Sequence, residues 1–354
     1  MRAPRGDIDL AFCRTCGMIF NASFRASLMG YDVPYENALH HSPRFQQYAE
    51  ELSRHLLTTY NLKDKVALEI GSGDGHFLQL LLDGGMSRGI GFDPSHEPVE
   101  RDDSMPITLL QDYFRSSLVP RPIHLACCRH VLEHIAEPHE FLAEIKSLVS
   151  GFATEMIIYF EVPDTRYSLE HGGIWDILYE HFTYFTPPSL KRLFRDAGFR
   201  VLNERTAYEG QFLSIEASTK QTRNSLPDAS NSDREQLARH VDDFARQYEA
   251  KLMRWNRELE LIGQKKQRAA LWGAGTKGVM FLNSVEGADH IGRVVDLNPR
   301  KHGSFVAGAG HRITSPESLA EWKPDIVLVM NPVYREEIAA SFGRLGIRPD
   351  LRIV

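Results

Sequence analysis

The chain has 354 residues, which is enough for two domains at roughly 100–200 residues each. Hydrophobic residues make up 42% and charged residues 25%, the balance of a globular protein with a sizeable core. The net charge of −6 argues against a nucleic-acid partner, because no basic excess exists to neutralise phosphates. No apolar run approaches the roughly 20 residues of a membrane span, and the N-terminus lacks the apolar core of a signal peptide. Four cysteines, two of them adjacent, exclude a disulfide scaffold, so we expect a cytoplasmic protein.

The first chemical feature along the chain is a pair of cysteines. Cys13 and Cys16 form a Cys-x-x-Cys pair in a short apolar context, which predicts two short strands joined by a knuckle. A zinc ion takes about four ligands, so this pair supplies half of a possible zinc site. His40 and His41 are the residues that would complete it, although their spacing does not require it.

Strands and helices alternate after this segment. Residues 43–59 follow a Ser-Pro pair and repeat apolar residues every three to four positions, which predicts a helix. Further on we expect strands at 66–70, 89–93, 123–127 and 155–162, with helices at 77–82 and 141–149. This alternation predicts an α/β fold with a parallel sheet covered by helices on both faces.

A polar, turn-forming stretch at 219–232 indicates a linker. Apolar residues then recur every three or four positions from Leu237 to Ile262, the signature of a long helix packed against a partner. We interpret it as a connector that faces the core, with dimerisation through it as the alternative, so the chain is expected to be a monomer or a homodimer. Strands at 269–272, 292–296 and 326–330 predict a second, smaller sheet. The expected units are thus 1–59 (knuckle and helical lead-in), 60–218 (first sheet), 219–264 (linker and long helix) and 265–354 (second sheet).

A glycine loop follows the first strand of the first sheet. Gly71, Gly73 and Gly75 lead from the strand into a helix, and eighteen residues later Asp93 ends the next strand. Glycines allow the backbone to turn sharply and a nucleotide to approach it, and the acid stands where a ribose hydroxyl would be held. The carboxylate of Glu69 before the loop suits a ligand that carries an ammonium and a sulfonium rather than phosphates.

The second sheet opens with a similar loop. Gly273, Gly275, Lys277 and Gly278 lead from a strand into a helix, and Asp296 ends the next strand eighteen residues after the last glycine. This spacing suits phosphates at a helix N-terminus. Two such loops, each between a strand and a helix and each followed by a spaced acid, indicate two nucleotide-binding folds. Plain tight turns without a ligand are the alternative, and they are a stronger alternative for the second loop.

Four segments of the first sheet resemble the class I S-adenosylmethionine-dependent methyltransferases: Glu69-Ile-Gly-Ser-Gly-Asp-Gly75, Gly91-Phe-Asp93, Asp112-Tyr-Phe114 and His130-Val-Leu-Glu-His134. The resemblance implies a class I methyltransferase Rossmann-like sheet with S-adenosyl-L-methionine as cofactor. It implies that Glu69 and the glycines line the methionine part and that Asp93 holds the ribose hydroxyls. Asp112 would approach the adenine amine, and the segment from Arg129 through His130 to His134 would pass beneath the cofactor.

The order of motifs along the whole chain is similar to that of the sugar C-methyltransferases with a C-terminal Rossmann-like domain. Such relatives act on nucleotide-linked keto-sugars, so the resemblance implies a small-molecule substrate of this class, with the second sheet holding its nucleotide. Those relatives carry two Cys-x-x-Cys knuckles that hold zinc, whereas this chain has one. Their Tyr-His-Glu-His stretch corresponds to Leu178-Tyr179-Glu180-His181 here, so Tyr179 stands where a histidine is expected. The resemblance also implies that Tyr35 lies near the sugar.

Methylation at a carbon beside a ketone needs a base that removes a proton and a donor that steadies the enolate oxygen. His181 beside Glu180 supplies the residue types for the base, since a histidine paired with a carboxylate accepts protons near pH 7. Sequence neighbours need not face each other, so a contact of Glu180 with substrate or backbone is the alternative. Tyr179, Tyr184 and Tyr35 are the expected donors to the oxygen. The alternative is that these side chains only pack the core.

Gln211, just before a late strand, is a further expected substrate contact. Three other functions remain open at this point. An O- or N-methyltransferase for a sugar or natural product would need the same cofactor. A nicotinamide-dependent oxidoreductase would use the loop at Gly273, but the loop at Gly71 would then have no ligand. A non-catalytic nucleotide-sugar binding protein is the last alternative, and cofactor binding would distinguish these classes.

Overall fold

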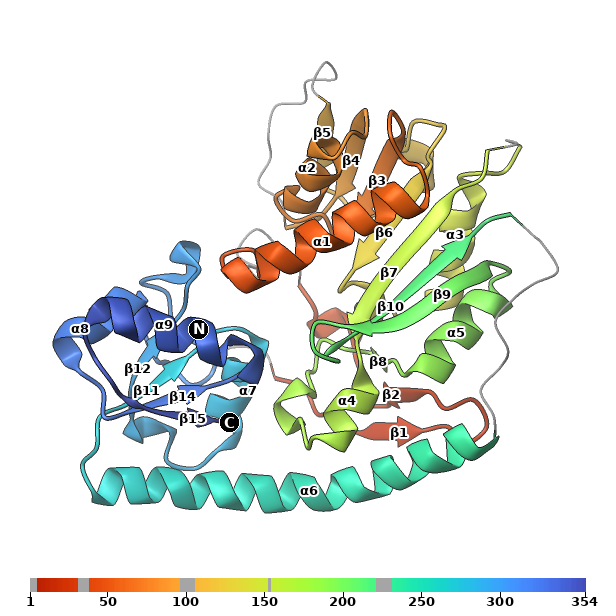
Figure 1. The fold of residues 1–354 in the computed structure, drawn as a ribbon. Coiled ribbons are helices and arrows are strands. Elements are labelled where there is room, and N and C mark those ends of the chain that lie inside the picture. Colours follow the sequence, from red (N-terminus) through yellow and green to blue (C-terminus); the bar gives the residue numbers. More distant parts are fainter. Residues whose placement is uncertain (1–4, 31–37, 96–105, 152–153, 221–230) are drawn as a thin grey trace.

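The computed structural model describes residues 5–30, 38–95, 106–151, 154–220 and 231–354. Two α/β bodies are joined by one long helix that runs along the base of both of them (Figure 1). Within the described parts of the chain, no helix is long and apolar enough to cross a membrane.

The first body is built on a seven-stranded sheet of order β5-β4-β3-β6-β7-β10-β9. All neighbouring strands are parallel except β10, which is antiparallel to both β7 and β9. The strands are β3 (Val66–Ile70), β4 (Arg88–Phe92), β5 (Ile107–Leu110), β6 (Leu125–Arg129), β7 (Ile157–Pro163), β9 (Arg200–Ala207) and β10 (Phe212–Ser218). The expected strand at 123–127 therefore lies two residues further on, and the other expected strands of this sheet are shifted by no more than two residues.

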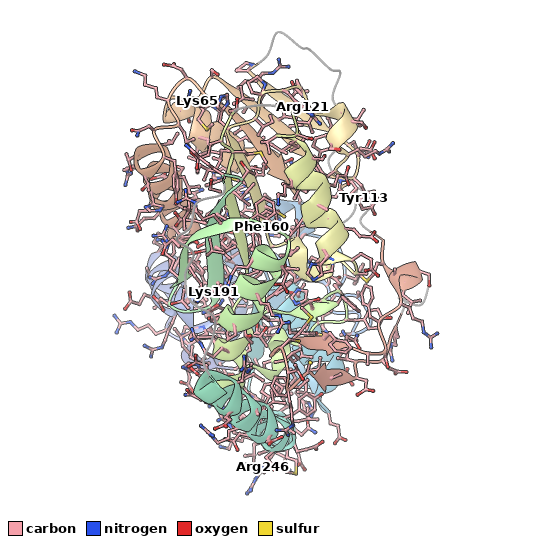
Figure 2. The ribbon with its side chains drawn as sticks, turned by 90° about the vertical axis from the view of Figure 1, so that its right-hand side faces the viewer. Lys65, Tyr113, Arg121, Phe160, Lys191 and Arg246 are labelled. Carbon is pink, nitrogen blue, oxygen red and sulfur yellow. The ribbon has the colours of Figure 1, made fainter. Side chains whose placement is uncertain are left out.

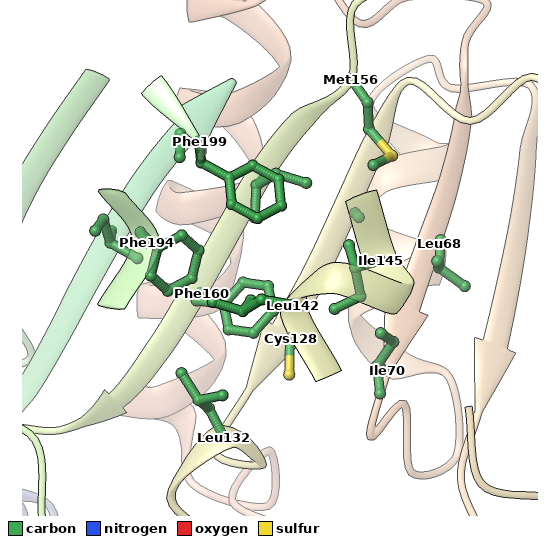
Figure 3. Close-up of a cluster of buried hydrophobic side chains, with 14 of the residues drawn as sticks. Leu68, Ile70, Cys128, Leu132, Leu142, Ile145, Met156, Phe160, Phe194 and Phe199 are labelled. Carbon is green, nitrogen blue, oxygen red and sulfur yellow. The ribbon is translucent and has the colours of Figure 1, made fainter. Parts of the chain in front are cut away.

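Helices pack on both faces of this sheet. The helices α1 (Pro43–Thr59) and α2 (His76–Asp83) contribute to the core on one face, and α3 (Pro138–Ser147) and α5 (Pro187–Asp196) contribute to the core on the other. Figure 3 shows the second of these cores, in which Leu142 and Phe194 from the helices meet Phe160 on β7. Burying one such side chain fully contributes about 1.5–3 kcal/mol to the free energy of folding. Phe160 is fully buried in the middle of the molecule, whereas Arg246 is exposed at its margin (Figure 2).

The N-terminal segment forms a small antiparallel sheet of order β1-β2-β8, with β1 (Leu10–Phe12), β2 (Ile19–Asn21) and β8 (Thr183–Tyr184). Cys13 and Cys16 lie in the turn between the first two strands, where the Cys13 N–H donates to the Met18 carbonyl over 2.9 Å. The pairing of β2 with β8 ties this hairpin to the segment just after His181.

The connector helix α6 (Asn231–Gln264) packs within the same chain. Its apolar residues, including Leu237, Phe244 and Trp255, share one buried cluster with the N-terminal hairpin and with the second sheet. The contacts of α6 with α4 (Thr165–Glu170) secure it to the first body. The long helix is thus a spacer with an intramolecular core face.

The second body is a five-stranded, all-parallel sheet of order β13-β12-β11-β14-β15. Its strands are β11 (Ala269–Trp272), β12 (Ile291–Val295), β13 (Ile313–Thr314), β14 (Ile326–Val329) and β15 (Asp350–Ile353), and its helices are α7 (Thr276–Ser284), α8 (Leu319–Trp322) and α9 (Arg335–Leu345). Together the two bodies confirm the expected fold class: a Rossmann-like sheet with a second, smaller α/β domain.

In both sheets the first strand lies in the interior and the chain proceeds first to one side of it, then to the other. The reversal falls between β3 and β6 in the first sheet and between β11 and β14 in the second. Parallel sheets bind ligands at such reversals, beyond the carboxyl ends of the strands. The glycine loops after β3 and β11 occupy those two positions.

Candidate functional site

Both glycine loops open into one cavity of about 1300 Å³. This volume exceeds the roughly 300–1,000 Å³ of a single small-molecule pocket. Of the residues expected to be functional, those that line it are Glu69, Gly71, Gly73, Asp93, Asp112, Arg129, His130, Glu180, His181, Gln211, Gly273, Gly275, Lys277, Gly278 and Asp296. The cavity therefore lies between the two bodies and has room for two ligands side by side.

The first loop needs glycine for backbone reasons. Gly71, Gly73 and Gly75 have φ angles of 75°, 53° and 82°, in the left-handed region that other residues rarely adopt. A Cβ on Gly71 would lie 2.2 Å from the Val131 side chain, whereas one on Gly73 would meet no atom within 4 Å. Gly73 thus presents bare backbone to the cavity, where a ligand can approach it closely.

Asp93, directly after β4, holds this loop in shape. Its Oδ2 accepts from the Gly73 N–H over 2.8 Å, and its Oδ1 accepts from the Ser95 N–H and hydroxyl over 2.8 and 2.6 Å. A carboxylate offers about four acceptor positions, so three such bonds leave capacity for a hydroxyl. Asp112 lies on the same wall, and both of its oxygens accept from the Arg115 guanidinium over 2.8 and 2.6 Å.

Glu69 is the least satisfied group of the loop. Its side chain comes from the end of β3 and is 3% exposed, and its Oε2 has no hydrogen-bond partner among the described residues. Burial raises the pKa of Glu69 to about 8, against the opposing effect of Arg129. A buried carboxyl beside a cavity favours a cationic ligand, because pairing with the cation offsets the lost hydration when the group ionises.

Arg129 and His130, at the end of β6, belong to a buried network around Glu161 on β7. The Arg129 Nε donates to Glu161 over 3.2 Å, and the His130 Nε2 lies 3.2 Å from the same oxygen. Tyr48 and Tyr159 also donate to Glu161. Burial by itself would raise the pKa of Glu161, but Arg129 and His130 hold it at about 2. The Arg129 guanidinium also stacks on Phe77, 4.5 Å from the ring centroid, so its position is fixed.

The second loop repeats the hydrogen bonds of the first. Asp296, directly after β12, accepts from the Ala274 N–H over 2.8 Å and from the Asn298 N–H over 2.9 Å. A Cβ on Gly278 would lie 2.1 Å from the Gly273 carbonyl oxygen, so helix α7 needs glycine there. A Cβ on Gly275, by contrast, would meet nothing within 4 Å. The free backbone at Gly275 faces the cavity, as Gly73 does in the first loop.

Contacts across the cavity join the bodies, and two of them involve residues that were expected to contact substrate. Lys277 on α7 forms an ion pair of 2.7 Å with Asp176 of the first body. Gln211 and Asn331 exchange two amide hydrogen bonds of 2.9 and 2.8 Å. Lys277 and Gln211, both expected to contact substrate, therefore also hold the two halves of the cavity together.

His181 lies in the loop before β8, where it is 7% exposed and lines the cavity. Its ring packs edge-on against that of His134, with centroids 5.0 Å apart. Burial lowers the pKa of His181 well below its usual range, and the neighbouring His134 and His130 lower it further. The ring is therefore neutral at pH 7, as a proton acceptor must be.

The tyrosines flanking His181 are not where their sequence positions suggested. The Tyr179 hydroxyl accepts from the Arg25 N–H over 3.0 Å and its ring stacks with Phe24, so the side chain lies against the N-terminal segment and outside the cavity. The Tyr184 hydroxyl donates to the Leu178 carbonyl over 2.6 Å, and the residue does not line the main cavity. The expectation that either hydroxyl steadies an acceptor oxygen thus loses its geometric basis. Tyr35 lies outside the described residues.

Cys13 and Cys16 are both free thiols and only partly exposed. Among the described residues, no third histidine, cysteine or carboxylate joins them in a cluster that could hold a metal ion. His40 instead lies 3.4 Å from Asp74 and stacks on His76, beside the first loop. The expected completion of a zinc site by His40 therefore finds no support, and zinc at the cysteine pair stays a prediction.

Three residues of the cavity wall or its support were not foreseen from the sequence: Glu161, Asp176 and Asn331. Glu161 sits in the middle of an otherwise apolar strand, and a charge there is the one local signal that could have indicated a buried network. Asp176 ends a short 3-10 helix and Asn331 follows β14, and sequence patterns say little about how side chains point in such short, irregular segments.

Two family models match successive parts of the chain. Residues 40–204 match the family model of a methyltransferase domain, and residues 212–345 match that of a C-methyltransferase C-terminal domain. The chain is 26% identical to the C-methyltransferase NovU of Streptomyces niveus over 288 residues, covering 77% of this chain and 68% of the relative.

Solved structures with partial similarity include two methyltransferases. One is the 1,6-didemethyltoxoflavin-N1-methyltransferase of Burkholderia thailandensis, at 16% identity and a TM-score of 0.38, covering 58% of this chain and 96% of that one. Another is the magnesium protoporphyrin IX methyltransferase of Synechocystis, at 18% identity and a TM-score of 0.33, covering 49% of this chain and 79% of that one.

The fold, the first loop and the first family match define an S-adenosylmethionine-dependent methyltransferase. The C-terminal match and the similarity to NovU make this class more particular, because both point to a C-methyltransferase.

The residues of the first loop fit this cofactor. The unpartnered Glu69 oxygen suits a cationic ammonium, Gly73 exposes backbone to a ligand, and Asp93 retains acceptor capacity for ribose hydroxyls. Glu69, Asp74, Asp93 and Asp112 make this wall acidic, which suits a ligand with a positive sulfonium and ammonium.

Proposed function

We propose that the protein C-methylates a nucleotide-linked keto-sugar. One observation carries the proposal: a single cavity is lined by both nucleotide-type loops and by a neutral histidine. S-adenosylmethionine at the first loop would supply an electrophilic methyl group. The acceptor would then extend from the second loop toward His181.

The second loop is suited to the nucleotide of the acceptor. Lys277, Arg300 and Lys301 line this part of the cavity, together with the acids Asp176 and Asp296. The cations and the N-terminus of α7 favour a diphosphate. Asp296 is proposed to accept ribose hydroxyls, as Asp93 is. Each of the two carboxylates accepts one N–H from its glycine loop and one N–H from the residue two positions further on.

His181 is proposed as the base that removes a proton from the carbon beside the ketone. The C–H bond breaks, the proton goes to a ring nitrogen, and the electron pair moves to the carbonyl oxygen as an enolate. Glu180 and Gln211 line the same cavity and are proposed contacts of the sugar. A sugar hydroxyl or amine would need no carbon acid, so proton exchange distinguishes C-methylation from O- or N-methylation.

The test is incubation with S-adenosylmethionine and a thymidine-diphosphate-linked 4-keto-hexose, followed by mass spectrometry and NMR of the sugar. We expect one added methyl on carbon and exchange of the α-proton with deuterated water when no methyl donor is present. A methyl on oxygen or nitrogen would contradict the proposal. Reduction of the sugar with NADH would instead support an oxidoreductase.

The role of the second loop has a matched test. Gly275→Val adds a side chain into open space at the loop, so the chain should fold and the acceptor KM should rise while cofactor affinity stays unchanged. Gly343→Val on α9 also meets open space but lies outside the cavity, and is the control. Equal effects of the two variants on the acceptor KM would contradict the role of this loop.

A further inference from the structure

A carboxylate and two imidazoles converge beside the cavity. Glu133 and His134 belong to the short helix η3 (Leu132–His134) just after β6, and His181 comes from the loop before β8. One side-chain oxygen of Glu133 and one ring nitrogen of each histidine all lie within 4.8 Å of one another. All three residues line the cavity. Segments far apart in the sequence thus form one polar cluster at the proposed base.

His134 has a defined tautomer in this cluster. Its Nδ1 lies 2.9 Å from the Glu180 carbonyl oxygen, which can only accept, so Nδ1 carries the hydrogen. Burial lowers the pKa of His134 to about 4, so the ring is neutral at pH 7. A neutral ring cannot balance a positive charge on His181. Glu133 is the member of the cluster that can.

Glu133 is buried without being satisfied. Its side chain is 3% exposed, its Oε2 has no hydrogen-bond partner among the described residues, and its nearest oxygen to His130 lies 3.8 Å from Nδ1. A buried acceptor left without a partner costs about 1–3 kcal/mol, so a group of this kind is a candidate for a functional role. Glu180, the sequence neighbour of His181, instead contributes its backbone carbonyl to this arrangement.

We propose that Glu133 is the positioning carboxylate of His181. Its unpartnered oxygen accepts the ring N–H, the opposite ring nitrogen faces the acceptor, and the carboxylate balances the charge when that nitrogen takes the proton. The present separation of up to 4.8 Å exceeds a hydrogen bond, as is common before substrates bind. The proposal rests on the proposed function, which makes His181 the base.

Other charged groups face this pair. His130 faces both Glu133 and His181, and Glu161 on β7 faces Glu133. Asp176 lines the small pocket behind the cluster together with Glu133 and His181. Burial raises the pKa of Glu133 to about 7, so a substantial fraction of this carboxyl is ionised at neutral pH. His130 and Asp176 stay unchanged in the variants below, so their effects cancel in the comparison.

The test compares Glu133→Gln, which keeps the shape and removes the charge, with Glu133→Asp, which keeps the charge. Glu216→Gln is the control, because Glu216 is a buried carboxylate outside the cavity. Readouts are kcat, KM, S-adenosylhomocysteine affinity and α-proton exchange of the keto-hexose probe. We expect Glu133→Gln to lower kcat and exchange by about 10²–10⁴ with cofactor affinity unchanged, and Glu133→Asp to recover part of the loss.

A second readout does not depend on the acceptor. Histidine NMR should show that His181 takes up its proton at a lower pH in Glu133→Gln than in the wild type, because a compensating charge is lost. This measurement separates the present proposal from the proposed function, whose failure would appear as a wild type that neither exchanges nor methylates the probe. Wild-type exchange in Glu133→Gln, or an unchanged His181 titration, would overturn the role of Glu133. So would a divalent metal that copurifies in one equivalent and disappears in Glu133→Gln. If Glu133→Gln does not fold, Glu133→Asp decides, and a fully inactive Asp variant with normal cofactor affinity would contradict the proposal.

Discussion

The two aspartates that close the glycine loops offer a paired test of which loop binds which ligand. Asp93 and Asp296 follow equivalent strands and each accepts one N–H from its glycine loop and one N–H from two residues further along the chain. Asparagine at either position keeps the shape and can still accept through one oxygen. It loses the negative charge and places an NH₂ group where the loop N–H needs an acceptor.

The expected change in ligand affinity follows from the hydrogen bonds that each substitution alters. A hydrogen bond to a charged group contributes about 1.5–3 kcal/mol, and about 1.4 kcal/mol corresponds to a factor of ten in affinity. Asp93→Asn weakens the bond from the ribose hydroxyls and the 2.8 Å bond that shapes the Gly73 turn. If one such contribution is lost from binding, the Kd for S-adenosylhomocysteine rises about 10- to 100-fold. Asp296→Asn should leave this Kd within about twofold, because distant sites act independently.

Isothermal calorimetry with S-adenosylhomocysteine and with a thymidine diphosphate sugar measures both affinities for both variants. We expect a crossed pattern, with Asp93→Asn weakening the cofactor product and Asp296→Asn weakening the nucleotide sugar. Melting temperatures control for loss of the folded state. Equal cofactor affinity in wild type and Asp93→Asn would refute the assignment of the first loop. A cofactor defect in Asp296→Asn as large as that in Asp93→Asn would refute the division of labour between the loops.

Three further outcomes can be checked. Burial raises the pKa of Glu69 to about 8 from an ordinary value of 4.5. Between these two values the folded ligand-free chain keeps a proton that the unfolded chain has released. The contribution of this group to stability therefore falls as pH rises from about 4.5 to 8. In Glu69→Gln the melting temperature should depend less on pH in that window than in the wild type. An unchanged pH dependence of the melting temperature would speak against the buried state of this carboxyl. Gln211→Leu should lower the free energy of unfolding by about 1–3 kcal/mol, because the Asn331 NH₂ group loses its acceptor. In chemical denaturation, the double variant Gln211→Leu/Asn331→Leu should lose less than the sum of the two single losses, and full additivity would mean that the pair does not interact. Gly278→Ala should lower the melting temperature, because its Cβ would meet the Gly273 carbonyl at 2.1 Å, and a variant as stable as wild type would show that the loop can relax.

The elements and loops were predictable because their signals are local. A glycine that must adopt a positive φ, followed at a fixed spacing by an acid at the end of the next strand, encodes one turn of the chain. Asp93 and Asp296 accordingly lie directly after β4 and β12. The long helix was also predictable, since apolar residues that repeat every three to four positions over such a length are typical of an α-helix. The strand at 107–110 was missed because it is short and half-buried, without a clear alternation.

The surroundings of His181 were not predictable in the same way. Tyr179, Glu180 and His181 are consecutive, yet their side chains have different environments: the first packs on the N-terminal segment, whereas the other two line the cavity. Sequence adjacency suggested that Glu180 supports the histidine. The carboxylate that clusters with both imidazoles is Glu133, which arrives from another strand end.

The sequence by itself determined that this chain has two α/β sheets that each open with a glycine loop, a helical connector and the loop chemistry of a methyltransferase, because each of these properties is encoded in short segments with characteristic spacing. Only the tertiary structure decided that both loops face one cavity and that the bridges Lys277–Asp176 and Gln211–Asn331 join its halves. It also decided which carboxylate stands beside His181. These properties depend on how strand ends from distant parts of the chain are brought to one edge, and on the direction in which each side chain leaves an irregular loop, and neither is written in local periodicity.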